Sequence, residues 1–214
     1  MQNIGLWIDH RTAVLVLLNE RTEETRQITA TVEPTHFGGN APAESAEEMR
    51  DRLLTASAHL DLTPAEAHPF PAESTWKFSQ HGPFNAVYDT TKRSAYLMVQ
   101  RQRRHPFLSL FDGADPNAST AARQTSTIPT QALYFINDPF FHAQAGAFAA
   151  SLMKLANDEA RSAEAYRILF QRQPSASERE RCIRFLASYP ANNADKWAAQ
   201  VRVLMASNEF LHID

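Results

Sequence analysis

Asp112, Asp115 and Asn117 bring two carboxylates and an amide together within six residues of sequence. Oxygen-bearing side chains of these types are the ligands that calcium prefers, and a pair of carboxylates is also what glycoside hydrolysis requires. The spacing is not that of an EF-hand loop. A rigid turn, in which the Asp and Asn side chains bond nearby backbone amides, accounts for the same residues. We therefore expect no bound cofactor here, with calcium as the alternative.

Two histidines are candidates for proton transfer. His142 follows Asp138 by four residues, which places imidazole and carboxylate on one face of a helix. Asp138 is also the residue expected to cap that helix, and no nucleophile stands at a recognisable offset. We predict no catalytic residue. The alternative is a hydrolase or accessory subunit acting on acidic polysaccharide, using Asp112 and Asp115 with His142 or His105.

A basic stretch without an acidic residue runs from 92 to 104, and its cations are Lys92, Arg93, Arg101, Arg103 and Arg104. Such a stretch can contact phosphate or acidic sugar, or its arginines can bond carbonyl groups of the loop behind them. We favour the second interpretation and keep an RNA- or ribosome-contacting protein as an alternative. Polar loop residues on a rigid frame are where binding is expected. The candidate ligand-binding residues are Arg101, Arg104, Asp112, Asp115, Asn117, Arg123, Gln131 and Asn137.

The composition excludes several classes of protein. None of the 6 glycines stands in a dinucleotide, P-loop or serine-hydrolase motif. The single cysteine, Cys182, cannot form a disulfide, a thiolate zinc site or a haem attachment. A net charge of -3 argues against a bulk nucleic-acid binder. The longest apolar run, 13–18, is too short for a membrane span or a signal peptide, so we expect the chain as given to be cytoplasmic, with no membrane partner.

Alternating apolar residues over the first 36 positions predict a three-stranded antiparallel β-meander, followed by a linker at 37–44. The remainder, 45–214, has mainly helical periodicity. A capping box at Ser45 and Glu48 begins a helix that reaches about His59. Further helices are predicted at 106–111, 129–136, 138–156, 159–171, 176–188 and 194–206, and a strand at 94–100. The predicted fold class is α+β and mostly helical, with long ordered loops and one or two short strands beside the N-terminal meander.

Aromatic residues are expected to hold the long proline-containing loops against this helical domain. The residues placed mostly in structural roles are Trp76, Phe78, Tyr96, Phe107, Phe111, Trp197 and Phe210.

Four passages carry a resemblance to a known family. They are HPFPAESTWKFSQHGPFNAVYDTTKRSAYLMVQRQRRHPFLSLFDGADPNAST, IPTQALYFINDPFFHAQA, AYRILFQRQPSASE and LMASNEFLHID. From about residue 44 onward the chain resembles the C-terminal part of a planctomycete-type domain of unknown function, number fifteen-fifty-three. This domain is usually the last one in multidomain proteins that begin with a cytochrome c-like module.

The resemblance implies an exported protein whose partners are other modules of a multidomain envelope system, and a part in handling complex polysaccharide. It supplies no catalytic residues. The chain departs from the family pattern because it lacks the haem module, the preceding companion domain and an export signal, so it looks like a fragment or a rearranged gene product.

The opening MQNIGLWIDHRTAVLVL is similar to a second family, the small bacterial host-attachment or translational-machinery proteins related to release-factor N-terminal domains. This likeness covers only about 35 residues, so no ribosome-binding role is carried over. Taken together, the sequence predicts a non-catalytic binding or scaffolding module linked to envelope polysaccharide.

Overall fold

A computed structural model describes residues 3–8, 12–19, 22–29, 45–66, 72–75, 87–119, 126 and 128–211, the first three ranges by their backbone alone. The chain divides into two compact units, Met1–Ala41 and Pro42–Asp214. In the first unit, β1 (Asn3–Ile8), β2 (Thr12–Asn19) and β3 (Thr22–Thr29) pair in the order β1-β2-β3. Both pairings are antiparallel, with Leu15 opposite Leu6 on one side and Arg26 on the other.

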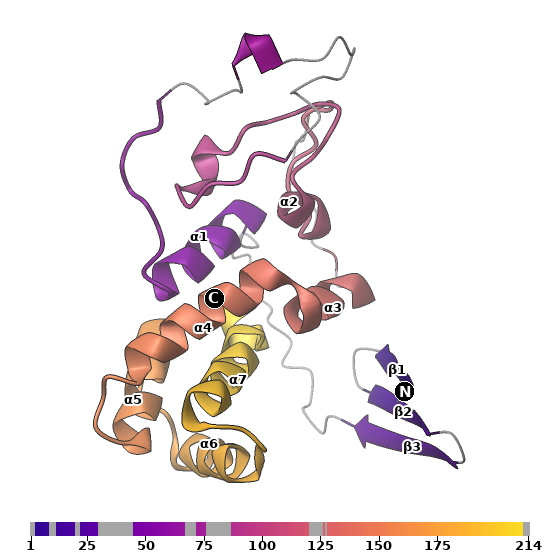
Figure 1. Ribbon diagram of the computed structural model, residues 1–214, viewed down its shortest axis with the longest axis vertical. Helices are drawn as coiled ribbons and strands as arrows, with labels where there is room; N and C mark the ends of the chain where they lie inside the picture. The colour runs from indigo at the N-terminus through magenta and orange to yellow at the C-terminus, as the bar shows by residue number, and fades with distance from the viewer. Residues whose placement is uncertain are drawn as a thin grey trace. The chain divides into compact units, whose positions relative to one another are not determined.

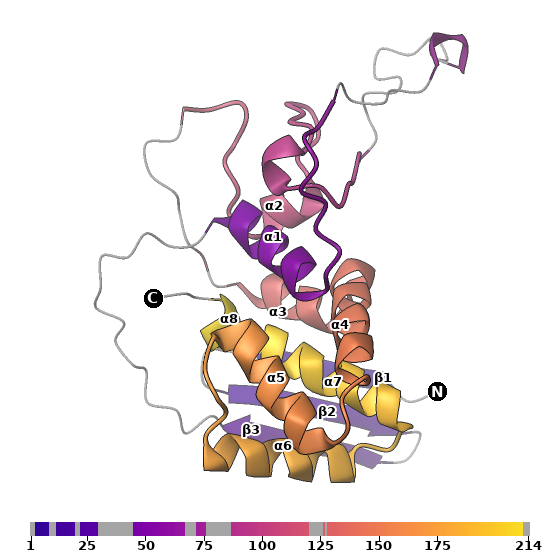
Figure 2. The same cartoon turned by 90° about the vertical axis from the view of Figure 1, so that its left-hand side faces the viewer.

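The described part of the second unit forms eight α-helices, labelled in Figure 1 and Figure 2. They are α1 (Ala46–Ala56), α2 (Pro106–Leu110), α3 (Pro129–Asn137), α4 (Pro139–Leu152), α5 (Asp158–Phe170), α6 (Ala176–Ser188), α7 (Asn193–Met205) and α8 (Asn208–Leu211). The predicted helices are confirmed as elements, while the short α8 was not predicted. None of the described helices has the length and apolar character needed to cross a membrane.

The helix starts follow from local capping chemistry. The Ser45 hydroxyl accepts from the Glu48 N–H and the Glu48 carboxylate accepts from the Ser45 N–H, so α1 begins in a complete capping box. Ser175 and Glu178 form the same arrangement before α6. Asp138 accepts from two N–H groups at the start of α4. Each cap satisfies backbone donors that a helix start leaves unpaired.

Helix α4 lies at the centre of the unit, with α1 and α2 to one side and α5, α6 and α7 to the other (Figure 1 and Figure 2). Its closest partner is α7. Alanines on the buried face of α4, Ala145 and Ala149, let the two backbones approach, and Phe141 and Phe148 fill the space beside them. From α7, Trp197 is completely buried, and its ring N–H donates to Asp158 at 2.9 Å.

Arg172 holds the far end of the helical unit together. Its guanidinium bonds both oxygens of Glu178 at the start of α6 and both oxygens of Glu209 in α8, at 2.6–2.9 Å. The same group lies 5.1 Å from the ring centroid of Tyr166. The residue before it, Gln171, ends α5 in a left-handed conformation that turns the chain toward α6. Two of the passages that carry the family resemblance, QRQPSASE and SNEF, thus meet through a single guanidinium.

The predicted α+β class is corrected to a helical fold. In the described ranges from 45 to 211 there is no strand, and the predicted strand at 94–100 is instead the 3-10 turn η3 (Ser94–Tyr96). Its backbone groups have other partners: the Ser94 N–H donates to Asp51 at 2.7 Å and the Leu97 N–H to the Ser94 carbonyl. The strands β1–β3 belong to the separate unit Met1–Ala41, so the predicted fold class, which joined an N-terminal meander to this helical fold, is not supported.

The aromatic predictions had mixed outcomes. Phe107, Trp197 and Phe210 are buried in the core, and Phe111 packs against it half-buried. Tyr96 is 44% exposed, so it is not part of the core. The other two aromatics, Trp76 and Phe78, lie outside the described residues.

The Arg172 arrangement predicts a measurable loss of stability. In Arg172→Met the side-chain stem remains, but Glu178 and Glu209 lose their shared cation, so we expect the free energy of unfolding to fall by about 1–3 kcal/mol. Urea titration followed by circular dichroism measures the change. The matched control is Arg184→Met, which breaks an exposed pair with Glu180 and should cost less than about 0.5 kcal/mol. Equal losses in the two variants would contradict the role given to Arg172.

The same contact predicts a pH dependence. Hydrogen bonding to Arg172 lowers the pKa of Glu178 to about 2 from 4.5, with help from the Ser175 N–H. Because the folded pKa is the lower one, the ionised carboxylate stabilises the fold above pH 4.5, and this stabilisation is lost as the pH falls toward 2. Glu178→Gln should therefore be less stable than the wild type at neutral pH, with a difference that shrinks as acid is added. A difference that stays constant in urea titrations from neutral pH into this acid range would refute the assignment.

Candidate functional site

Arg50 fastens the middle of the chain to α1. Its side chain is only 1% exposed, and it donates to the Lys92 carbonyl and the Ser94 hydroxyl, each at 3.2 Å. It also donates to Asp89 at 2.8 Å and to the carbonyl of Thr90. A buried charge is tolerated only when it is paired and hydrogen-bonded, so these partners keep segment 89–94 on the helix.

Asp89 links this anchor to a histidine. Nε2 of His105 lies 3.7 Å from the Asp89 carboxylate, and its side chain is 12% exposed. The His105 ring first, and then the charge of Arg50, lowers the pKa of Asp89 to about 2. Nearby, burial and the carboxylate of Asp138 raise the pKa of Tyr134. The arrangement is an ionised carboxylate beside an imidazole, and it places His105 at the start of α2.

Sequence reasoning missed the role of Arg50 and the contact between Asp89 and His105. Asp89 is 39 residues away from Arg50, so no local spacing announces the pair. One signal was present: Arg50 lies in the apolar stripe that Met49, Leu53 and Leu54 form on α1. A cation in a buried stripe requires acceptors from elsewhere in the chain.

The predicted loop residues mostly bond the loop to itself. Asp112 has a positive φ of 58°, and its carboxylate accepts from the N–H and the hydroxyl of Ser126 at 2.6 and 2.7 Å. The Asp115 carboxylate accepts from the Asn117 N–H at 2.9 Å, while the Asn117 amide donates to the Arg101 carbonyl at 3.0 Å. These bonds support the rigid-turn interpretation, since one oxygen of each carboxylate and the amide nitrogen of Asn117 bond groups of the protein itself.

The other predicted residues are spread over the neighbouring elements. Arg104 donates to the carbonyl of Gly113, and Gln131 donates to the Leu110 carbonyl at 3.0 Å from the start of α3. Asn137 bonds the Leu133 carbonyl at the end of α3. Arg123 lies outside the described residues. The structure thus gathers Arg101, Arg104, Asp112, Asp115 and Asn117 into one braced loop and leaves Asn137 at a helix end.

The cations of the basic stretch differ in their exposure and in their partners. Lys92 pairs with Asp61 at 2.9 Å, and Arg93 lies 3.8 Å from Asp51. Further along, Arg101, Gln102 and Arg103 are exposed, as are Tyr96 at 44% and Val99 at 74%. We call residues 93–103 the exposed segment 93–103, because most of their side chains are exposed while Ser94 and Leu97 are buried and hold the segment in place.

The predicted pairing of His142 with Asp138 is not made. Nε2 of His142 lies 2.8 Å from the Ile136 carbonyl, a contact in which the imidazole donates. The Asp138 carboxylate instead accepts from the N–H groups of Phe140 and Phe141 as the cap of α4. A ring nitrogen that donates to a carbonyl does not act as a base, so this arrangement favours a structural role for both residues.

The fold and the braced loop define a helical module that carries an ordered, partly basic surface segment. Its family is given by residues 26–186, which match the family model PSD1, described as a protein of unknown function (DUF1553). The chain belongs to this family. Comparison with curated proteins and with solved structures finds no match. None of these comparisons supports the likeness of the first 35 residues to release-factor-related proteins.

Gly113 gives a test of the braced loop. Its N–H donates to the Leu108 carbonyl at 2.6 Å, and an added Cβ would lie 2.7 Å from that same oxygen. Gly113→Ala must therefore shift backbone, and we expect faster amide hydrogen exchange across 104–119 and a stability loss of about 1–3 kcal/mol. Gly146→Ala is the matched control, because nothing lies within 4 Å of its added Cβ on α4. The control should gain about 0.5–1 kcal/mol, and unchanged exchange in Gly113→Ala would disprove the bracing.

Proposed function

We propose that this chain is a non-catalytic binding or scaffolding module and that the exposed segment 93–103 holds an acidic polysaccharide. The observation that carries the proposal is that some polar side chains of this region bond the protein while others are exposed. The Asp112 carboxylate accepts from the N–H and the hydroxyl of Ser126, and one oxygen of Asp115 accepts from the Asn117 N–H, while the side chains of Arg101 and Tyr96 are exposed. A hydrolase would require two carboxylates aimed together at one bond of the substrate, and the Asp112 carboxylate is bonded to Ser126 instead.

The chemistry of the exposed segment suits an acidic sugar. A guanidinium forms paired hydrogen bonds with a carboxylate, and an aromatic ring offers a flat apolar face to the C–H face of a sugar. The anchor at Arg50 supports this assignment, because a surface fixed in advance loses less conformational entropy when it binds. An envelope setting with companion modules as partners is what the family resemblance implies, and it forms part of this proposal.

The RNA-binding alternative receives less support. Nucleic-acid contact requires several cations on one open surface. At least three of the five cations in the stretch have partners within the protein: Lys92 pairs with Asp61, Arg93 with Asp51, and Arg104 donates to Gly113.

The test measures binding of polygalacturonate against neutral dextran by affinity electrophoresis of the full chain. We expect retardation by polygalacturonate alone. The affinity should fall about tenfold in Arg101→Gln, the scale of one charge-assisted contact, and severalfold in Tyr96→Ala, which removes the apolar face for the sugar ring. Arg184→Gln on α6 is the control for loss of an exposed cation and should bind like the wild type. Equal binding by all variants, or no binding at all, would refute the proposal. Release of reducing ends from the polymer would favour the hydrolase.

A further inference from the structure

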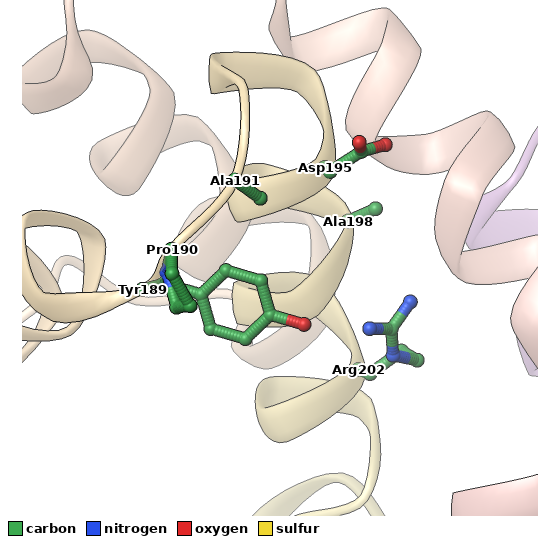
Figure 3. Close-up of a pocket in the computed structure, with 6 residues that line it drawn as sticks. All are labelled: Tyr189, Pro190, Ala191, Asp195, Ala198 and Arg202. Carbon is green, nitrogen blue, oxygen red and sulfur yellow. The ribbon is translucent and has the colours of Figure 1, made fainter.

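An open hollow lies where α6 gives way to α7. Its volume is about 470 Å³, and its lining, drawn in Figure 3, is Tyr189, Pro190, Ala191, Asp195, Ala198 and Arg202. None of these residues belongs to the loop surface of the proposed function. The volume falls within the range of about 300–1,000 Å³ that small-molecule sites occupy.

Local geometry creates the hollow. Helix α6 ends at Ser188; its C-cap residue, Tyr189, is extended with φ -76° and ψ 122°, and Pro190 follows. On α7, Asp195, Ala198 and Arg202 follow at steps of three and four residues, so they share one face of the helix. The small methyl group of Ala198 leaves space between a carboxylate at one end and a guanidinium about 10 Å further along the helix.

The state of the Arg202 side chain suggests that this hollow binds an anion. It is half-buried, yet within the described part of the chain its guanidinium has neither a hydrogen bond nor an ion pair. Elsewhere the guanidinium groups of Arg50, Arg161 and Arg172 each bond a carboxylate of this protein. A partly desolvated guanidinium whose donors go unused binds an anion favourably when one is supplied.

Tyr189 adds a second donor beside this cation. Its ring packs against Phe185 with centroids 5.4 Å apart, which fixes its direction. Figure 3 shows the Tyr189 hydroxyl and the Arg202 guanidinium extending into the same space. At the other end, one oxygen of Asp195 accepts from the Asn192 amide at 2.7 Å. A carboxylate has further lone pairs with which it can accept from ligand hydroxyls.

We propose that this hollow binds a small hydroxylated carboxylate, such as a sugar acid. Arg202 pairs with the ligand carboxylate, the Tyr189 hydroxyl donates to the same group, and Asp195 accepts from ligand hydroxyls. The helix dipole accounts for an acid in the first turn of α7 and a base in its last turn. It does not account for the tyrosine hydroxyl between them or for the open space that the three groups line.

The experiment titrates the full ¹⁵N-labelled chain with glucuronate, using glucose as the neutral match, and follows amide shifts by NMR. We expect saturable shifts at Ala191, Asp195 and Ala198 with glucuronate and none with glucose. Arg202→Gln should weaken binding about tenfold or more, as loss of a charge-assisted pair does. Tyr189→Phe keeps the ring and its packing and should weaken binding severalfold. The control Arg184→Gln should bind like the wild type.

The possible results distinguish failure of this proposal from failure of the loop proposal. Shifts that do not saturate, shifts elsewhere in the chain, equal response to glucose, or unchanged affinity in folded Arg202→Gln would each overturn the proposal. Trigalacturonate tests the source of the ligand: tighter binding than glucuronate at the same amides indicates a polymer residue, and equal binding indicates a free acid. Tyr96→Ala and Arg101→Gln should leave glucuronate binding intact, so failure of the loop proposal does not decide this one.

Discussion

The structure of the loop region depends on one buried guanidinium. Arg50 enters the interior from α1, where a cation without partners would be too costly to keep. Segment 89–94 supplies those partners as two carbonyls, a hydroxyl and a carboxylate. Segment 89–94 depends on Arg50 in turn, because the same contacts fix the position of this segment, which forms neither a strand nor a helix. The contact of Asp89 with His105 then places the start of α2, and the residues of the braced loop flank α2 on both sides.

Arginine performs a comparable task at the other end of the unit. The planar fork of Arg172 bonds two carboxylates that are 31 residues apart in sequence, Glu178 and Glu209. The packing of α4 on α7 supplies most of the apolar burial, but apolar contacts are not directional. The guanidinium contacts are directional, and they set where the turn after α5, the start of α6 and α8 come together. Helix packing therefore gives the unit its interior, while the two arginines fix the segments between helices.

This division explains which features could be predicted from the sequence. The helices could, because caps such as Ser45 with Glu48 and Ser175 with Glu178 are complete within four residues. The conformation of segment 94–100 could not be predicted, because its alternating apolar residues were interpreted as a strand. In the structure Leu97 is buried but Val99 is 74% exposed, and the Ser94 N–H donates to Asp51 of α1. A contact 43 residues away decided its conformation. Alternation indicates a strand only when a neighbouring strand is present to take its hydrogen bonds.

Site prediction met a related difficulty. Residue types placed Asp112, Asp115 and Asn117 on a loop, but they could not tell whether the polar atoms face a ligand or the protein. In the structure one oxygen of each carboxylate accepts from the protein and the Asn117 amide donates to it. Tyr189 and Arg202 carried no motif, since 13 residues and a helix start separate them, and only the geometry of the hollow brings them together. The useful distinction is therefore between polar groups that the chain itself satisfies and those that it leaves unsatisfied. Asp112 belongs to the first kind and Arg202 to the second, so ligand chemistry is to be sought beside Arg202 even though the sequence pointed to Asp112.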